Sequence, residues 1–109
     1  MLDIKCIVAI VERGKADIVV KEAKNAGAAG ATIFYGRGTG QTEVRKFLKT
    51  HIEASKEIII ILTEVDKLKV IMKAMIKAGK LNDPGTGIIF TISISDLVGL
   101  HHRDQFEIE

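Results

Sequence analysis

Two runs of β-branched residues limit how this chain of 109 residues can fold. Ile4 to Val11 and Glu57 to Leu62 are apolar at nearly every position rather than at every second one. Such runs are typical of central strands that are buried on both faces. Each run precedes a helix-forming segment and a further strand, which gives the order β-α-β, loop, β-α-β. This order predicts an α+β domain, the ferredoxin-like βαββαβ sandwich, with two helices on one face of an antiparallel sheet.

Periodicity and capping residues locate the two helices. The spacing predicts a first helix over 15–26, which Gly27 would end, and a second helix that Thr63 would cap at its N-terminus. The apolar stripe of the first helix is expected to hold Ile18, Val19, Ala23 and Ala26, and that of the second Val65, Leu68, Met72, Met75 and Ile76. Both stripes are expected to pack against the sheet.

Two further strands are expected at 31–35 and 87–96. In the last strand, apolar residues such as Phe90 alternate with polar ones such as Thr91, which predicts one buried face and one face toward water. Residues 36–42 hold too many glycines for a helix or strand and are predicted to form a mobile loop. For residues 43–55 the sequence leaves a short helix and an extended arm open. Because both long strands are apolar on two faces, we expect a homo-oligomer in which other copies cover the open side of the sheet.

Composition narrows the class of protein. Apolar residues make up 47% of the chain, so a packed core is expected. Sixteen basic and fourteen acidic residues leave a net charge of +2, which predicts no nucleic-acid partner. No signal peptide or membrane span is recognisable, so we expect a cytoplasmic protein that does not insert into membranes. Cys6 lies in an apolar strand and is expected to be buried and reduced.

A glycine-rich turn between the second helix and the last strand is the clearest candidate for a binding site. It reads Gly79-Lys80-Leu81-Asn82-Asp83-Pro84-Gly85-Thr86-Gly87. Glycines let main-chain N–H groups converge, and converging N–H groups bind anions. No Gly-Lys-Ser/Thr opens a helix here, so we expect the turn to hold a phosphate rather than to transfer it. An ordinary helix-to-strand connection is the alternative.

Nothing in the pattern predicts an enzyme. Catalysis would require a nucleophile with a base, or paired carboxylates in a cleft. Asp83 and Asp96 each stand alone in a predicted turn.

The order and spacing of several segments resemble the PII family of nitrogen-regulatory signalling proteins, over nearly all of the chain. The segments are the strand 4–10, the link 27–32, the run 36–44, and the turn and strand 79–90. The resemblance implies a trimer of ferredoxin-like subunits that binds adenine nucleotides in the clefts between subunits. It also implies that a long loop after the second strand reports the bound state to target proteins.

This resemblance divides the single domain 1–109 into functional parts. Residues 36–55 correspond to the T-loop of the family, 79–87 to its phosphate-binding B-loop, and 97–109 to a C-terminal tail. The implied nucleotide-binding residues are Thr32, Gly36, Arg37, Gly38, Thr39, Gly40, Gln41, Leu62, Gly79, Lys80, Gly85, Thr86, Gly87, Ile88, His101 and Arg103. Two registers of the glycine loop stay open, since either Gly36 with Gly38 or Gly38 with Gly40 matches the glycine pair of the family.

Departures from the family pattern bear on the ligand. Ile88 stands where the family has a lysine, and Gly99 and His101 stand where it has two arginines. Residues 45–55 lack the tyrosine that some members modify. The resemblance implies AMP, ADP or ATP as effector, with Mg²⁺ as an optional companion. Because these lysine and arginine side chains are missing, a nucleoside mono- or diphosphate is favoured over a triphosphate.

We therefore expect a cytoplasmic homotrimer that binds an adenine nucleotide and regulates a transporter or a metabolic enzyme through residues 36–55. One alternative is a ferredoxin-like trimer that resembles the divalent-cation-tolerance proteins and binds metal through His101 and His102. A second alternative is a structural module whose glycine segments are only turns.

Overall fold

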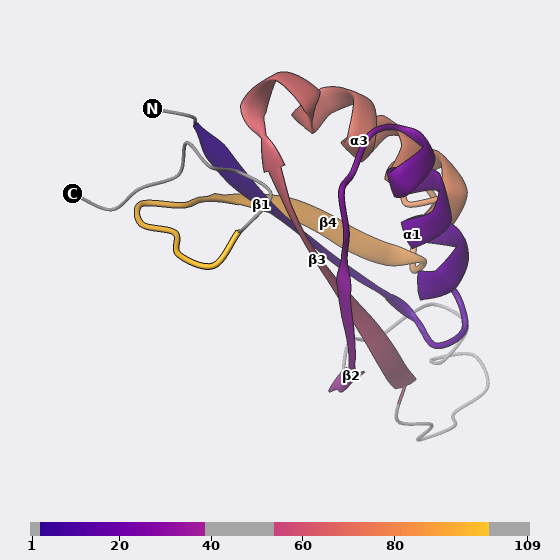
Figure 1. The fold of residues 1–109 in the computed structure, drawn as a ribbon. Helices are drawn as coiled ribbons and strands as arrows, with labels where there is room; N and C mark the ends of the chain where they lie inside the picture. Colours follow the sequence, from indigo (N-terminus) through magenta and orange to yellow (C-terminus); the bar gives the residue numbers. More distant parts are fainter. Residues whose placement is uncertain (1–2, 39–53, 101–109) are drawn as a thin grey trace.

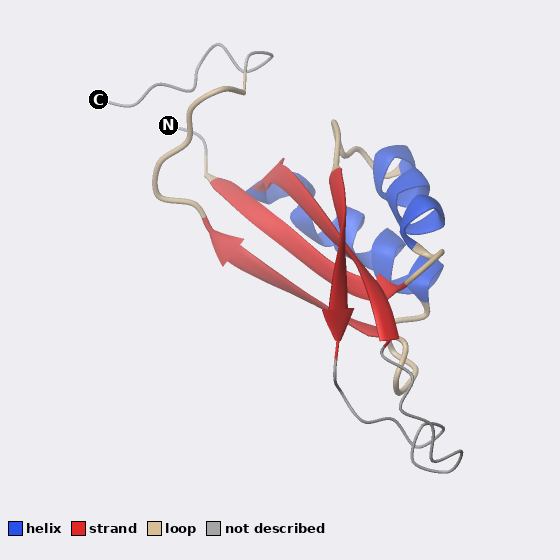
Figure 2. Ribbon diagram, turned by 90° about the horizontal axis from the view of Figure 1, so that it is seen from below, coloured by secondary structure: helices blue, strands red, loops and turns tan. Residues whose placement is uncertain are grey.

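The computed structural model describes residues 3–38 and 54–100. The described residues form β1 (Ile4–Glu12), α1 (Ala16–Asn25), β2 (Thr32–Gly38), β3 (Ala54–Glu64), α3 (Val65–Gly79) and β4 (Gly87–Ser93). The strands make one antiparallel sheet in the order β2-β3-β1-β4. The two helices pack against each other on one face of the sheet (Figures 1 and 2). The predicted ferredoxin-like sandwich is confirmed.

The two apolar runs form the central strands, as predicted. β1 pairs with β3 along its whole length, with Ile7 opposite Ile61 and Ala9 opposite Ile59. These four side chains are buried beneath the helices together with Val11. Side chains alternate along a strand, so the intervening residues point to the opposite, open face of the sheet.

The open face is apolar as well. Its half-buried members are Val8, Ile10, Ile58, Ile60 and Leu62, and its exposed members are Phe34, Ile88, Phe90 and Ile92. Within a single chain the predicted burial of the Phe90 face of β4 is not seen, because Phe90 is 41% exposed whereas Ile89 packs against the core. Thr91 is exposed on the helix side, since the helices contact β1 and β3. β4 also ends at Ser93, three residues before the predicted end.

The prediction of a loop at 36–42 is wrong for residues 36–38, which continue β2. Antiparallel pairing places Gly36 opposite Lys56 and Gly38 opposite Ala54. A Cβ on Gly36 would lie 2.6 Å from the Ile58 side chain, and one on Gly38 would lie 2.9 Å from that of Lys56. The glycines leave room for large neighbours in a paired strand. Residues 39–53 lie outside the described residues.

The predicted cap of the second helix is also wrong. β3 continues through Thr63, which pairs with Lys5, and the N-cap position of α3 is taken by Glu64. Thr63 is buried, and its hydroxyl donates to the Glu64 carbonyl (3.2 Å) rather than accepting from the helix. The Val65 amide donates to the Asp3 carbonyl (3.0 Å), so the residue before β1 provides the acceptor for the first amide of α3.

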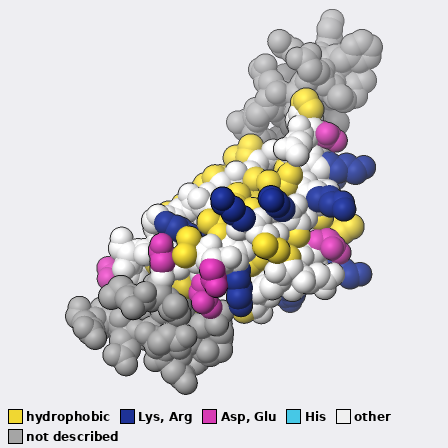
Figure 3. All heavy atoms as spheres, turned by 90° about the horizontal axis from the view of Figure 1, so that it is seen from above, with side chains coloured by type: hydrophobic (Ala, Val, Ile, Leu, Met, Phe, Trp, Pro, Cys, Tyr) yellow, Lys and Arg dark blue, Asp and Glu magenta, His cyan; other side chains and the backbone are white. Residues whose placement is uncertain are grey.

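The apolar stripes of the helices are partly as predicted. α1 buries Ala16, Val19, Val20 and Ala23, and α3 buries Ile71, Met75 and Gly79. Ile18 and Val65 are instead exposed, at 53% and 44%. Seen from above, the surface of the molecule carries basic side chains interspersed with acidic and apolar ones (Figure 3).

Candidate functional site

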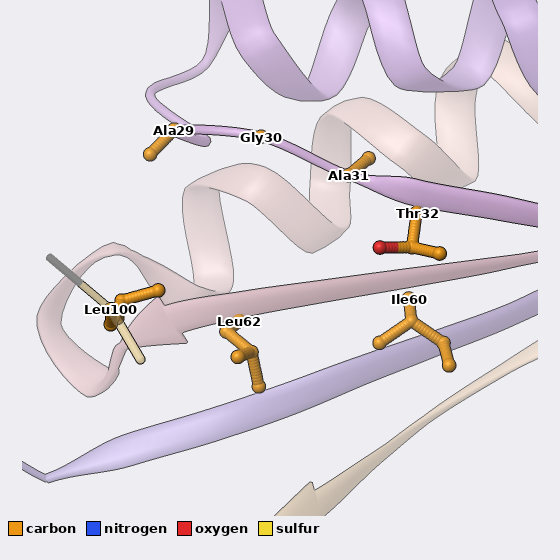
Figure 4. Close-up of a pocket in the computed structure, with 7 residues that line it drawn as sticks. All are labelled: Ala29, Gly30, Ala31, Thr32, Ile60, Leu62 and Leu100. Atoms are coloured by element: carbon orange, nitrogen blue, oxygen red, sulfur yellow. The ribbon is translucent and has the colours of Figure 1, made fainter. Parts of the chain in front are cut away.

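A hollow of about 340 Å³ opens beside the start of β2 (Figure 4). Its lining comes from the link before β2, the paired strands β2 and β3, and the segment after β4. The lining residues are Ala29, Gly30, Ala31, Thr32, Ile60, Leu62 and Leu100. The volume lies in the range of sites that bind small molecules, about 300–1,000 Å³.

The end of α1 shapes the link that forms one side of this pocket. Gly27 has a φ of +121°, and the Ala28 amide donates to the Ala23 carbonyl (3.0 Å). This bond spans six residues, as in a Schellman motif, and turns the chain back toward the sheet. Ala28 is buried by the turn, so residues 29–31 run along the pocket as irregular backbone.

The chemistry of the pocket is mainly apolar. Ile60 and Leu62 project from β3 on the open face, and the Thr32 hydroxyl is the polar side-chain group in the lining. None of the lining side chains carries a charge. Such a lining fits a flat, neutral ring whose edge bonds to backbone groups and a hydroxyl, as a nucleobase does.

The glycine turn after α3 is held by its own hydrogen bonds. Lys80 has a left-handed backbone (φ 53°), and the Leu81 amide donates to the Ile76 carbonyl (2.9 Å), which ends the helix. The Thr86 hydroxyl lies 2.8 Å from the Lys80 carbonyl oxygen and 3.0 Å from that of Asp83. A single hydroxyl therefore ties together both halves of the turn.

Two glycines of the predicted site are accounted for by packing. Gly79 is buried, and a Cβ there would lie 3.2 Å from both Leu81 and Val19. Gly87 pairs with Val11 at a φ of +153°, and a Cβ there would lie 2.5 Å from the Ile10 carbonyl oxygen. These positions let α3 approach α1 and let β4 approach β1.

The predicted site residues fall into three groups in the described chain. Thr32 and Leu62 line the pocket, and Gly36, Arg37 and Gly38 follow along β2 toward its end. Lys80, Gly85, Thr86, Gly87 and Ile88 form the third group, at the β4 edge of the sheet. Thr39, Gly40, Gln41, His101 and Arg103 lie outside the described residues.

Distance separates these groups within one chain. Four residues of strand separate Thr32 from Gly36, which is about 13 Å. The end of β2 and the glycine turn lie at the same end of the sheet but on opposite edges, because Gly36 pairs with Lys56, Lys56 with Glu12, and Val11 with Gly87. Three strand spacings, about 14 Å, lie between those edges.

Sequence reasoning missed Ile60, Leu100 and the backbone of residues 29–31 as parts of the pocket. The only signal for the link was its run of small residues from Gly27 to Ala31. Leu100 carried no signal, because its place depends on the path of the chain after β4.

Sequence reasoning also missed a buried carboxylate in the first half of β3. Glu57 is 8% exposed, and its Oε1 accepts hydrogen bonds from the amides of Gly14 (2.8 Å) and Ala16 (2.9 Å). It thereby caps the start of α1 from a strand that is distant in sequence. Nearby, the Arg13 guanidinium lies 5.8 Å from the centre of the Tyr35 ring.

The described residues offer no cluster of three or more His, Cys, Asp or Glu side chains that could hold a metal ion. Cys6 is a free, buried thiol, as predicted, and burial raises its pKa. His101 and His102, the ligands of the metal-binding alternative, lie outside the described part of the chain.

The antiparallel sheet, its strand order and the two helices on one face define a ferredoxin-like protein with a segment inserted between β2 and β3. The family model of nitrogen regulatory protein P-II matches residues 4–104, and the chain belongs to this family. Proteins of the family are signalling regulators rather than enzymes.

A solved structure supports the same fold. The crystal structure of Arabidopsis thaliana PII bound to citrate matches with a TM-score of 0.70 and 19% identity, covering 92% of this chain and 85% of that one. Among curated proteins, none matches this chain. No helix in the described ranges is long and apolar enough to cross a membrane.

Proposed function

We propose that this chain is a homotrimeric, cytoplasmic signalling protein that binds an adenine nucleotide at the seams between subunits. The bound nucleotide would act through residues 36–55 on a transporter or a metabolic enzyme. Residues 1–109 would act as one domain, with 79–87 as the phosphate-binding turn and 97–109 as a tail beside the ligand.

The separation of the two glycine segments carries this proposal. The end of β2 and the turn at Thr86 lie about 14 Å apart on opposite edges of the sheet, so one phosphate group cannot contact both within a single chain. A neighbouring copy supplies the missing edge. The apolar open face gives such copies a reason to associate, since Phe90, Ile88 and Ile92 are between 41% and 57% exposed.

The pocket supports the placement of the base. An adenine ring would lie over Ile60 and Leu62, with Thr32 and the link backbone at its edge. The phosphates would then extend along β2, which runs from Thr32 in the pocket to Gly36 and Gly38. Thr39, Gly40 and Gln41 would continue this contact.

The turn of the neighbouring copy would hold the phosphates from the other side. Lys80 is exposed and supplies a cation, and Gly85 has a φ of +77°, a conformation that exposes backbone amides. Ile88, at 57% exposure, adds no charge. His101 and Arg103 of the tail are the remaining candidates. This sparse set of cations favours AMP or ADP over ATP, with Mg²⁺ as an accompanying ion.

The attachment points of residues 36–55, which we call the arm, support a role in signalling. Gly38 and Ala54 are partners in the β2–β3 ladder, so the arm leaves and rejoins the sheet where the phosphates would lie. A ligand that binds one arrangement of the arm more tightly shifts the population toward it. A target protein that binds this arrangement more tightly than the others would then respond to the nucleotide.

Ligand titration and sedimentation test the proposal together. We expect a trimer by analytical ultracentrifugation, and stabilisation by AMP or ADP in a thermal-shift series that also includes ATP, cyclic nucleotides and divalent metals. Lys80→Gln should weaken ADP binding by about tenfold, the value of one charge-assisted contact, by calorimetry. Lys77→Gln removes an exposed charge one helical turn away and should leave binding unchanged. A monomer, or a trimer that no nucleotide stabilises, would refute the proposal.

A further inference from the structure

The chain after β4 returns to the sheet instead of leaving it. In Figure 1 this segment, coloured yellow, bends back beyond the end of β4. The Ile94 amide donates to the Ile4 carbonyl (3.3 Å), which continues the contact with β1 for one residue. Six residues later, Leu100 lines the same pocket as the link, the start of β2 and the last part of β3 (Figure 4). We name residues 94–100 the strap.

The strap is bonded to β1 at Ile94 and reaches the pocket at Leu100, with the half-buried Leu97 between them. Among the described backbone hydrogen bonds outside helices and strands, the strap takes part only through Ile94. Val98 is 79% exposed, so it contributes little packing. Gly99 has a φ of +104°, and a Cβ there would have no atom within 4 Å, which makes this residue a hinge in open space.

The pocket therefore has one fixed side and one movable side. The fixed side consists of Thr32, Ile60 and Leu62 on paired strands, and of the link that the Schellman turn holds. The movable side is Leu100, next to the hinge. An apolar ring that fills the hollow must contact both sides, so its binding energy includes contact with the strap.

We propose that the strap is a ligand-dependent closure: a bound nucleobase holds Leu100 against the pocket and so immobilises residues 94–100. The free protein samples positions with Leu100 away from the pocket, and the ligand selects the closed position. The strap would thus report occupancy of the pocket independently of residues 36–55. The inference rests on the proposed nucleotide site.

A label on the strap tests this directly. Val98→Cys carries an exposed thiol for a maleimide fluorophore, while the native Cys6 is buried with a raised pKa and reacts slowly. We expect the anisotropy of the label to rise on titration with AMP or ADP, with the same midpoint as binding measured by calorimetry. Val70→Cys, 57% exposed on α3, is the control and should not respond.

Two leucine variants distinguish a specific closure of the pocket from a general loss of stability. Leu100→Ala should weaken nucleotide binding by about tenfold, the value of one buried leucine contact, and abolish the anisotropy change of a Val98→Cys label. Leu97→Ala shortens a half-buried leucine of the same strap that does not line the pocket, and it should change neither.

The outcomes are distinct. Nucleotide binding by calorimetry without a change at Val98 would overturn the strap and leave the proposed function intact. Tighter binding by Leu100→Ala would show that the leucine obstructs the pocket, and would also overturn the closure. The absence of any nucleotide binding would refute both proposals.

Discussion

Replacing Glu57 by alanine should cost this protein a large share of its stability. The carboxylate is 8% exposed, and it accepts hydrogen bonds from two amides at the start of α1, those of Gly14 and Ala16. Ala16 is itself fully buried, so water cannot easily replace the lost acceptor. The perturbation therefore leaves the buried Ala16 amide without an acceptor, whereas water can reach the amide of the exposed Gly14.

The magnitude follows from the groups left without partners. Each unsatisfied buried amide costs about 1–3 kcal/mol. Loss of a negative charge at a helix N-terminus adds about 0.5–1 kcal/mol. For the buried Ala16 amide and the lost charge together, Glu57→Ala should cost about 1.5–4 kcal/mol, out of a total of about 5–15 kcal/mol for a typical domain. Glu57→Gln keeps an acceptor oxygen and loses only the charge, so it should cost about 0.5–1 kcal/mol.

Urea unfolding at a fixed protein concentration, followed by circular dichroism, measures the difference. At a slope of about 1.5 kcal/mol per molar urea, Glu57→Ala should lower the midpoint by about 1–2.7 M and Glu57→Gln by less than about 0.7 M. Glu12→Ala removes an exposed carboxylate from the end of β1 and should change stability by less than about 0.5 kcal/mol. Equal losses in the two Glu57 variants, or a loss below about 1 kcal/mol for alanine, would refute the reasoning.

Three further predictions concern other parts of the molecule. Gly87→Ala should cost about 3 kcal/mol in urea unfolding because its Cβ would meet the β1 backbone, whereas Gly14→Ala, with open space and a φ of +94°, should cost about 1 kcal/mol. Burial raises the pKa of Cys6 above its ordinary value of 9.0, so its contribution to stability is fully present below pH 9 and falls as the pH rises further. Unfolding at about pH 8 and about pH 10 checks this, and Cys6→Ala should remove that part of the difference. In sedimentation, Phe90→Glu should dissociate the proposed trimer, whereas Val70→Glu on the exposed side of α3 should not.

The sequence predicted the layers of the fold because burial on two faces leaves a clear pattern. β1 and β3 contain long runs, 4–11 and 57–62, that are apolar at nearly every position, and such runs are typical of central strands. The alternation in β4 was equally clear, but alternation does not say which face the helices cover. The row of exposed apolar residues around Phe90 lies on the face that the helices leave open.

The errors at Gly36–Gly38 and Thr63 have a common cause. Local propensity favours a loop at the glycines and a helix cap at the threonine, but pairing along the full length of β3 overrides both preferences. The pocket was hard to predict for a similar reason. Leu100 reaches it through the path of the strap, which no local pattern records.

The β2–β3 ladder that reaches Gly38 and Ala54 also affects how this chain can diverge. The two ends of the inserted segment are fixed next to each other by the sheet itself. Doubling the length of a flexible insertion between fixed ends adds only about 0.6 kcal/mol of closure entropy. Residues between these points can therefore be lengthened, shortened or replaced at little cost to folding, while the sheet and the helices stay the same.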